Sequence, residues 1–331
     1  MESMTANAPL VSIGLPTYNG ERYIREALDS LVAQDYPNLE ILVLDNASTD
    51  GTLAIVEEYA RRDGRIRLIR NPINIGAPAN FNLAFRESTG PFFMWAADDD
   101  RWEPSYVSAC LSVLRAAPSA VLACSRVRFV DEAGDLVELD PLLYDNPDLS
   151  SPKIGRRIRI LLSRGAWYQV YGLMRRDSLA RTRLHTNAYG ADVVLLVELA
   201  LLGPFVLVPE TLFQYRVFPS RTEPDRGALH NALDDRTRVL SAPNTHLQEA
   251  CAEAVMTSGL RPTEKLQAWL ALSAAAYLQP TPLRGRIADE ATIRLSAALR
   301  ERNLRHFLKY GALSAAIAIR RFARRSVRAV S

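Results

Sequence analysis

Short apolar runs alternate with amphipathic stretches along the first third of the chain. A short continuous apolar run with β-branched residues predicts a buried strand, whereas apolar residues at helical spacing predict a helix. The expected strands are residues 10–15, 39–44, 66–69 and 92–97, and the expected helices between them are residues 21–34, 52–62 and 80–87. Strands that alternate with helices predict a mostly parallel α/β sheet that is flanked by helices.

The middle of the chain continues with both kinds of element. We expect helices at residues 103–116, 153–162 and 193–202, a short helix from residue 175, strands at residues 120–125, 126–130, 168–174, 206–208 and 212–217, a hairpin turn at residues 131–135 and a loop at residues 140–152. Beyond residue 222 the pattern becomes helical. The helices expected there are residues 228–240, 245–257, 262–277 and 287–300. We therefore expect a sheet domain over residues 1–222 and a helical C-terminal appendage over residues 223–331.

The composition narrows the class of protein but does not indicate a function. The 331 residues are 48% hydrophobic and 23% charged, which is typical of a globular protein. The three cysteines lie far apart without metal-ligand spacing, so we expect no disulfide framework and no structural zinc site. We see no signal peptide at the N-terminus and no apolar run long enough to span a membrane. These features favour a cytoplasmic protein.

Residues 304–330 are basic and have an apolar stripe. One interpretation is an amphipathic helix that lies on an anionic membrane, at the inner face of the membrane. The other is a packed helix with an arginine-rich end. A single aromatic residue, Phe322, lies among the arginines, which is too few to form a row of base-stacking platforms, so we expect no nucleic-acid partner.

Three polar clusters directly follow predicted strands, at residues 16–19, 45–50 and 98–100. Parallel strands end at the same edge of a sheet, where ligands bind in open α/β folds, so these clusters are expected to lie together. The last cluster is Asp98, Asp99 and Asp100. Adjacent carboxylates at a strand end favour a hard divalent cation, Mg²⁺ or Mn²⁺, that is shared with substrate phosphates. The alternative is a solvated acidic turn before the next helix.

A further carboxylate, Asp192, lies at the start of the apolar helix that is expected over residues 193–202. An acidic residue in the first turn stabilises a helix, because it complements the positive end of the helix dipole. The same carboxylate at the mouth of the sheet domain could instead accept a proton from a substrate. The sequence pattern is compatible with both roles.

Several of these segments together resemble the inverting family 2 glycosyltransferases, which have the GT-A fold. The resemblance covers about residues 9–222 and rests on residues 11–19, residues 43–52, Asn74-Ile75-Gly76, the acidic cluster with Trp102 and Pro104, Ala191-Asp192 and Tyr215-Arg216. It implies a GT-A, Rossmann-like sheet. It also implies that Pro16 and Tyr18 line the nucleotide base pocket, that Asp45 and Asn46 hold the base and ribose, and that Asp98 contacts the ribose.

The resemblance further implies that Asp192 is the catalytic base and that Asp99, or its neighbour Asp100, binds the metal. The chain departs from the family pattern at four positions: Asn46 and Ala97 replace acids that the family commonly has, Ala191 replaces a usual Glu, and Phe218 stands where a His is frequent. A supporting metal or phosphate contact is therefore expected to be missing.

The implied activity is metal-dependent, inverting transfer of a sugar from a nucleotide-diphosphate sugar to a hydroxyl of a glycan or lipid-linked acceptor, in cell-surface polysaccharide synthesis. One alternative is a nucleotide-sugar-binding homologue with little or no turnover. Another is a nucleotidyltransferase. That class normally has a glycine-rich, basic phosphate loop after its first strand, and residues 16–20 contain no lysine.

Overall fold

The computed structural model describes residues 8–138, 147–163, 167–187, 190–218 and 243–278. The strands in this part of the chain are β1 (Val11–Thr17), β2 (Leu39–Asp45), β3 (Ile66–Arg70), β4 (Phe92–Trp95), β5 (Arg101–Trp102), β6 (Leu122–Val130), β7 (Leu173–Arg175) and β8 (Phe205–Arg216). They form one sheet in the order β3-β2-β1-β4-β7-β6-β8-β5.

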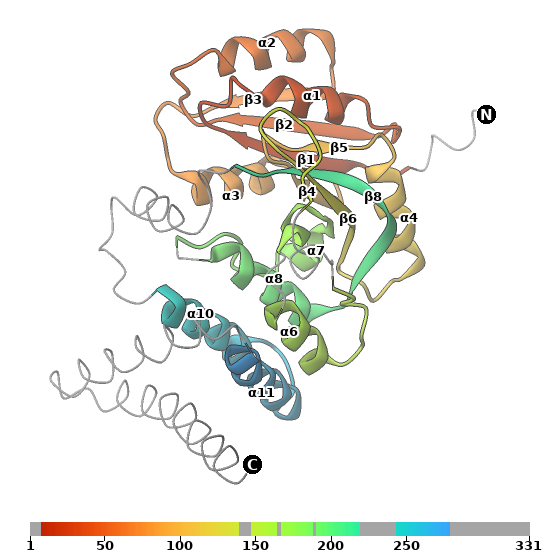
Figure 1. Ribbon diagram of the computed structural model, residues 1–331, viewed down its shortest axis with the longest axis vertical. Coiled ribbons are helices and arrows are strands. Elements are labelled where there is room, and N and C mark those ends of the chain that lie inside the picture. The colour runs from red at the N-terminus through yellow and green to blue at the C-terminus, as the bar shows by residue number, and fades with distance from the viewer. Residues whose placement is uncertain (1–7, 139–146, 164–166, 188–189, 219–242, 279–331) are drawn as a thin grey trace, which may run out of the picture.

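Helices cover both faces of this sheet (Figure 1). They are α1 (Ile24–Val32), α2 (Thr52–Arg62), α3 (Ala77–Glu87), α4 (Tyr106–Ala116), α6 (Ile154–Ser163), α7 (Arg176–Leu179), α8 (Ala191–Leu202), α10 (Pro243–Thr257) and α11 (Pro262–Leu278), with the 3-10 helix η1 at Tyr168–Tyr171. Helices α1, α2 and α4 bury their apolar residues against one face, and α3 and α8 cover the other.

The first half of the sheet is the parallel arrangement that the sequence pattern predicts. Strands β3, β2, β1 and β4 all pair in parallel. Alternate residues of β2 face opposite sides: Ile41 belongs to the core under α1, and Leu42 belongs to the core under α3. A strand that is buried on both faces reads as a continuous apolar run, which explains the pattern in the sequence.

The second half differs from the prediction in three places. The expected strands at residues 120–125 and 126–130 form one strand, β6, and those at residues 206–208 and 212–217 form one strand, β8. The β6–β8 ladder shifts register around Ser125–Val127. This irregularity accommodates Pro209 inside β8, since proline is tolerated in strands at bulges. The expected strand at residues 168–174 is instead η1 followed by β7.

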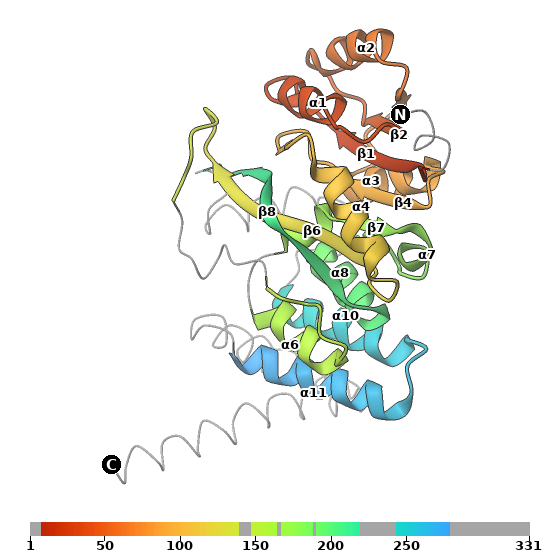
Figure 2. The ribbon, with the colours of Figure 1, turned by 90° about the vertical axis from the view of Figure 1, so that its right-hand side faces the viewer.

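Helices α10 and α11 confirm two of the predicted C-terminal helices. Helix α10 packs on α8, where Leu247 lies against Gly190, and α11 packs on α6 (Figure 2). None of the helices in the described ranges is long and apolar enough to cross a membrane. The predicted helices at residues 228–240 and 287–300, the basic segment at residues 304–330 and much of the loop at residues 140–152 lie outside the described residues. The domain boundary at residue 222 stays a prediction.

Candidate active site

The carboxyl ends of β1, β2 and β4 meet at one edge of the sheet, and hydrogen bonds join the segments that follow them. Thr17 pairs with Asp45 in the parallel ladder, and the backbone N–H of Asn46 donates to the Thr17 carbonyl over 2.9 Å. The Thr17 hydroxyl donates to Asp98 Oδ2 over 2.5 Å. The polar clusters that the sequence placed at one edge therefore lie together.

A cavity of about 470 Å³ opens at the ends of β2 and β3. It is lined by Asp45, Ala47, Ser48, Arg70, Asn71 and Pro72. Its volume lies within the range of small-molecule sites, roughly 300–1,000 Å³. Of the residues that the resemblance assigns to the nucleotide, Asp45 is in this lining. Pro16 is buried in β1, and Tyr18 is 47% exposed beside it.

Asn46 lies behind the wall of this cavity, with only 3% of its surface exposed. Its side-chain oxygen accepts hydrogen bonds from Asn71 Nδ2 and from the backbone N–H of Ile75. An amide oxygen has two lone pairs, so this acceptor is saturated within the chain. The side chain of Asn46 holds the loop after β3 in this structure.

Asp98 lies next to Gly20, and the two approach each other closely. A Cβ atom added to Gly20 would come within 2.4 Å of Asp98 Oδ2 and 2.8 Å of Thr17 Oγ1. Both Asp98 and Asp99 are partly exposed. Glycine at position 20 therefore makes room for the carboxylate that follows β4.

Asp100 points inward and is only 1% exposed. Its Oδ1 accepts the backbone N–H of Arg216 over 2.8 Å, while Oδ2 is buried and has no partner among the described residues. Burial raises the pKa of the Asp100 carboxyl well above its usual range, and the negative charges of Asp99 and Asp98 raise that pKa further. Of the two predicted metal ligands, Asp99 is the one with access to solvent.

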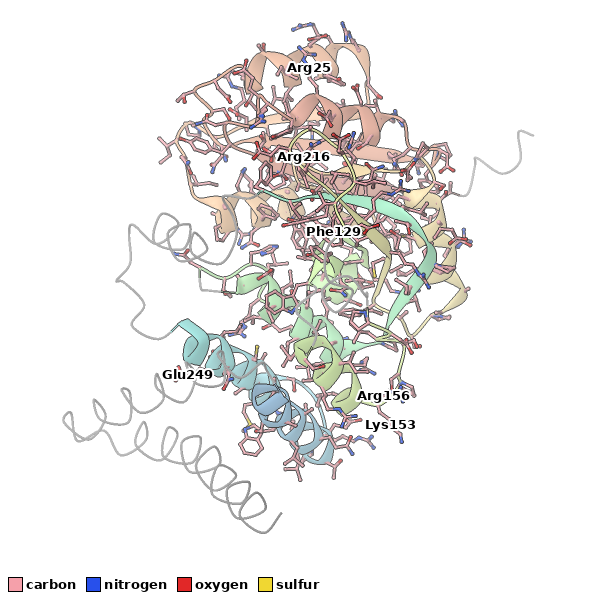
Figure 3. The ribbon with its side chains drawn as sticks, viewed as in Figure 1. Arg25, Phe129, Lys153, Arg156, Arg216 and Glu249 are labelled. Atoms are coloured by element: carbon pink, nitrogen blue, oxygen red, sulfur yellow. The ribbon has the colours of Figure 1, made fainter. Side chains whose placement is uncertain are left out.

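Arg216 fixes the acidic segment from the second half of the sheet. Its side chain is fully buried, and Nε donates to the carbonyl of Asp99 over 2.9 Å. Nη2 forms an ion pair with Glu26 of α1 over 2.7 Å, and Nη1 donates to the carbonyls of Asp131 and Glu132. Figure 3 shows Arg216 near α1, far from two exposed cations, Lys153 just before α6 and Arg156 in α6.

Asp192 is the second residue of α8. The helix is preceded by Gly190, whose φ of 67° lies in the left-handed region. The environment of Tyr171 connects this helix start to the acidic segment. Burial raises the pKa of the Tyr171 hydroxyl well above its usual range, and the nearby Tyr215, Asp100, Asp99 and Asp192 raise that pKa further. Asp99 and Asp192 therefore both lie close enough to Tyr171 to act on it electrostatically.

Phe218, which stands where the resembling family often has a histidine, packs edge-to-face on Tyr23 with ring centroids 5.6 Å apart. The guanidinium of Arg216 lies over the same Tyr23 ring, 4.4 Å from its centroid. Phe218 therefore packs against the same Tyr23 ring that contacts Arg216.

Comparison with known proteins decides the family. Residues 12–179, which are more than half of the chain, match the model of glycosyl transferase family 2. The chain belongs to glycosyl transferase family 2. A Mycobacterium tuberculosis protein without an assigned activity is 32% identical over 250 residues, which cover 74% of this chain and 68% of that protein. The chondroitin synthase of Escherichia coli is 31% identical over 208 residues, which cover 62% of this chain and 29% of the synthase.

Solved structures show the same fold. Residues 1–349 of Staphylococcus aureus TarS, in complex with UDP-GlcNAc, superimpose with a TM-score of 0.59 at 17% identity, and the match covers 92% of this chain and 90% of that one. This family 2 glycosyltransferase therefore has the GT-A architecture that the sequence resemblance implies. The likeness is one of fold, because the identity is low.

The acidic edge of this glycosyltransferase fits a divalent ion that is shared with a substrate. The described residues contain no group of three His, Cys, Asp or Glu side chains arranged to hold a metal alone. Mg²⁺ and Mn²⁺ at phosphate sites commonly take one or two carboxylates and complete their coordination with water and substrate oxygens. Asp99, partly exposed beside Asp98, suits that kind of site, and the buried Asp100 does not.

Sequence reasoning missed two side chains in this glycosyltransferase. Arg70 ends β3, is exposed and lines the cavity beside Asp45. The sequence did contain a signal for Arg70, because it is a positively charged residue at the carboxyl end of a predicted parallel strand. Tyr171 had no such signal, because its position depends on η1, which the sequence pattern predicts as a strand.

Proposed function

We propose that the chain transfers a sugar from a nucleotide-diphosphate sugar to an acceptor hydroxyl, with inversion at the anomeric carbon. One observation carries the proposal: the cavity beside Asp45 and the acidic segment at Asp98–Asp100 lie at the same edge of the sheet, and Asp192 lies close enough to Tyr171 to act on it electrostatically, as Asp99 and Asp100 do. The fold likeness to TarS, which was solved with UDP-GlcNAc, supports this class of donor.

The donor subsite uses the ends of β1 to β4. The base and ribose occupy the cavity beside Asp45 and Ser48, with Tyr18 and Pro16 at the end of β1 next to it. Arg70 provides a positive charge at the rim, which favours an anionic ligand. Asp98, held by Thr17, accepts a ribose hydroxyl.

Asp99 would hold a divalent ion, Mn²⁺ or Mg²⁺, between the protein and the diphosphate. Such an ion, when bound, neutralises the negative charge that grows on the leaving diphosphate. Arg216 contributes by fixing the backbone of Asp99 from the buried side, so the carboxylate is already placed before the donor binds.

Asp192 accepts the proton of the acceptor hydroxyl as that oxygen attacks the anomeric carbon. A hydroxyl is a poor nucleophile at neutral pH, so a base within hydrogen-bond reach is needed. Attack from the face opposite the diphosphate inverts the centre in one step, and no nucleophile from the enzyme is required.

The acceptor in this proposal is a glycan or a lipid-linked glycan of a cell-surface polysaccharide. The partial match to a chondroitin synthase supports a polysaccharide context. The contact of residues 304–330 with the inner face of the membrane, outside the described residues, belongs to the same proposal. Sedimentation with anionic liposomes tests it: the full-length chain pellets and a chain truncated at Gly311 does not, whereas equal pelleting of both would refute the contact.

A panel of UDP-, GDP- and dTDP-sugars with Mn²⁺ tests the proposed activity. We expect donor hydrolysis, and transfer when an acceptor is present, for at least one donor, with loss of both on addition of EDTA. Donor binding without any turnover would instead identify a binding homologue. Release of pyrophosphate from a nucleoside triphosphate and a sugar phosphate would identify a nucleotidyltransferase.

A further inference from the structure

Four asparagine side chains join the end of β2 to the loop between β3 and α3. Asn46 Nδ2 donates to Asn74 Oδ1 over 2.8 Å, and Asn71 Nδ2 donates to Asn46 Oδ1 over 3.1 Å and to Asn80 Oδ1 over 2.8 Å. Asn80 Nδ2 in turn donates to the carbonyl of Leu44 in β2. We call these residues, Asn46, Asn71, Asn74 and Asn80, the amide cluster.

Backbone groups fix the orientation of the two central amides. The N–H of Ile75 donates to Asn46 Oδ1 over 3.0 Å, and the N–H of Gly76 donates to Asn74 Oδ1 over 2.8 Å. A backbone N–H can only donate, so both of these side-chain atoms must be oxygens. The contact between Asn46 and Asn74 therefore runs from the nitrogen of Asn46 to the oxygen of Asn74. A carboxylate at position 46 would place two oxygens against each other there.

The amide cluster shapes the donor cavity without lining most of it. Asn46 is 3% exposed and Asn80 is 2% exposed, and neither is part of the cavity wall. Asn71 and Pro72, which belong to the loop that the cluster holds, do line the cavity, together with Asp45 and Ser48. The cluster therefore connects the buried end of β2 to the surface that faces a ligand.

We propose that Asn46 is a positioning residue of the donor subsite, which holds the wall at Asn71 and Pro72 through the amide cluster and needs an amide rather than a carboxylate to do so. This inference rests on the proposed function for its ligand. It replaces the expectation from the family resemblance that position 46 contacts the base. The saturated oxygen of Asn46 and its burial behind the wall support the positioning role.

The diagnostic variant is Asn46→Asp, which keeps the size and an acceptor oxygen, removes the donor and, when ionised, adds a negative charge. UDP and GDP, each with Mn²⁺, are titrated calorimetrically into the full chain between pH 5.5 and 7.5. For whichever nucleotide binds the unmutated chain, we expect at least tenfold weaker binding by the variant at pH 7.5. The ratio of the two affinities should approach one as pH falls, because the protonated carboxyl can again donate to Asn74. Reporting a ratio cancels the effects of pH that are common to both proteins.

Asn38→Asp is the matched control. Asn38 is exposed just before β2 and donates to the carbonyl of Ala8, far from the cavity. The same chemical change at this position should leave nucleotide affinity unchanged at every pH. Wild-type affinity of Asn46→Asp at pH 7.5, or a loss that does not respond to pH, would overturn the positioning role.

A second measurement needs no nucleotide. In Asn46→Asp, the carboxylate at position 46 repels the side-chain oxygen of Asn74. The backbone amide of Gly76 should then lose its acceptor and exchange with deuterium faster. The backbone amide of Ile75 should keep its acceptor, because an oxygen remains at position 46. Unchanged exchange at Gly76 would overturn the inference. If neither UDP nor GDP binds the unmutated chain, the proposed function fails, and the exchange experiment still tests the amide cluster.

Discussion

The two halves of the sheet carry different parts of the site and are built differently. Strands β1 to β4 pair in parallel and place Asp45 at the last position of β2 and Asp98 three residues after the end of β4. Strands β6 to β8 mix parallel and antiparallel pairing and provide Arg216, and η1 beside them provides Tyr171. We call strands β1 to β4 the donor half, and short sequence patterns are enough to predict where its site residues lie. The second half contributes through contacts with the donor half that join residues far apart in the sequence.

The largest effect in the donor half is expected for Asp99→Ala. Loss of this carboxylate would remove the proposed protein ligand for the divalent ion, so donor affinity in Mn²⁺ should fall on the order of a hundredfold. Calorimetry with and without Mn²⁺ measures this. Asp135→Ala, in an exposed turn, serves as the control, and unchanged Mn²⁺-dependent affinity for Asp99→Ala would exclude Asp99 as the ligand.

The contact between the halves is tested by Arg216→Met. The substitution leaves the carbonyls of Asp99, Asp131 and Glu132 without their buried donor, and we expect a loss of roughly 3 kcal/mol in the free energy of unfolding. Arg22→Met breaks the exposed ion pair with Glu132 and should cost less than about 1 kcal/mol. Urea denaturation compares the two. Equal losses would show that Arg216 is no more important to the fold than a surface arginine.

A pH effect on stability is expected where the segment before α8 packs on β4. His185 lies 4.8 Å from the Trp95 ring, and burial lowers its pKa from 6.5 to about 4. The unfolded chain then binds the proton first, so stability is full above about pH 6.5 and falls as pH decreases toward 4, by on the order of 2 kcal/mol. His185→Phe keeps the ring packing and should flatten this dependence in thermal melts. A variant with the wild-type pH profile would assign the effect to other groups.

A smaller effect is expected within the donor half for Gly20→Ala. The added methyl would displace Asp98, and donor affinity should fall by about tenfold. Gly64→Ala is the matched control, because a Cβ atom there has no neighbour within 4 Å. If both variants bind the donor equally well, the close approach of Gly20 to Asp98 is irrelevant to binding.

The difference between the two halves of the sheet also explains which features could be predicted from the sequence. Helix α2 has the predicted bounds, residues 52–62, because its apolar spacing and its preceding turn are local signals. The carboxylates after β2 and β4 were found for the same reason. The ion pair between Arg216 and Glu26 joins residues 190 positions apart, and no local pattern encodes such a contact.

Position 46 shows a second limit. The family pattern assigns it to the ligand, and only the coordinates reveal that Asn71 and Ile75 occupy its oxygen. Residue type and spacing identify which loops meet at an edge. They do not show which side chains in those loops face the cavity and which hold its wall.

The account depends on Asp192 and the donor edge serving one reaction. Asp192→Asn tests this most directly, with donor affinity in Mn²⁺ and transfer rate measured on the same preparation. We predict donor affinity within about twofold of wild type and a transfer rate lower by roughly 10²–10⁴-fold. Asp177→Asn, at the equivalent first-turn position of α7, should leave both values unchanged. Near wild-type transfer by Asp192→Asn would contradict the account.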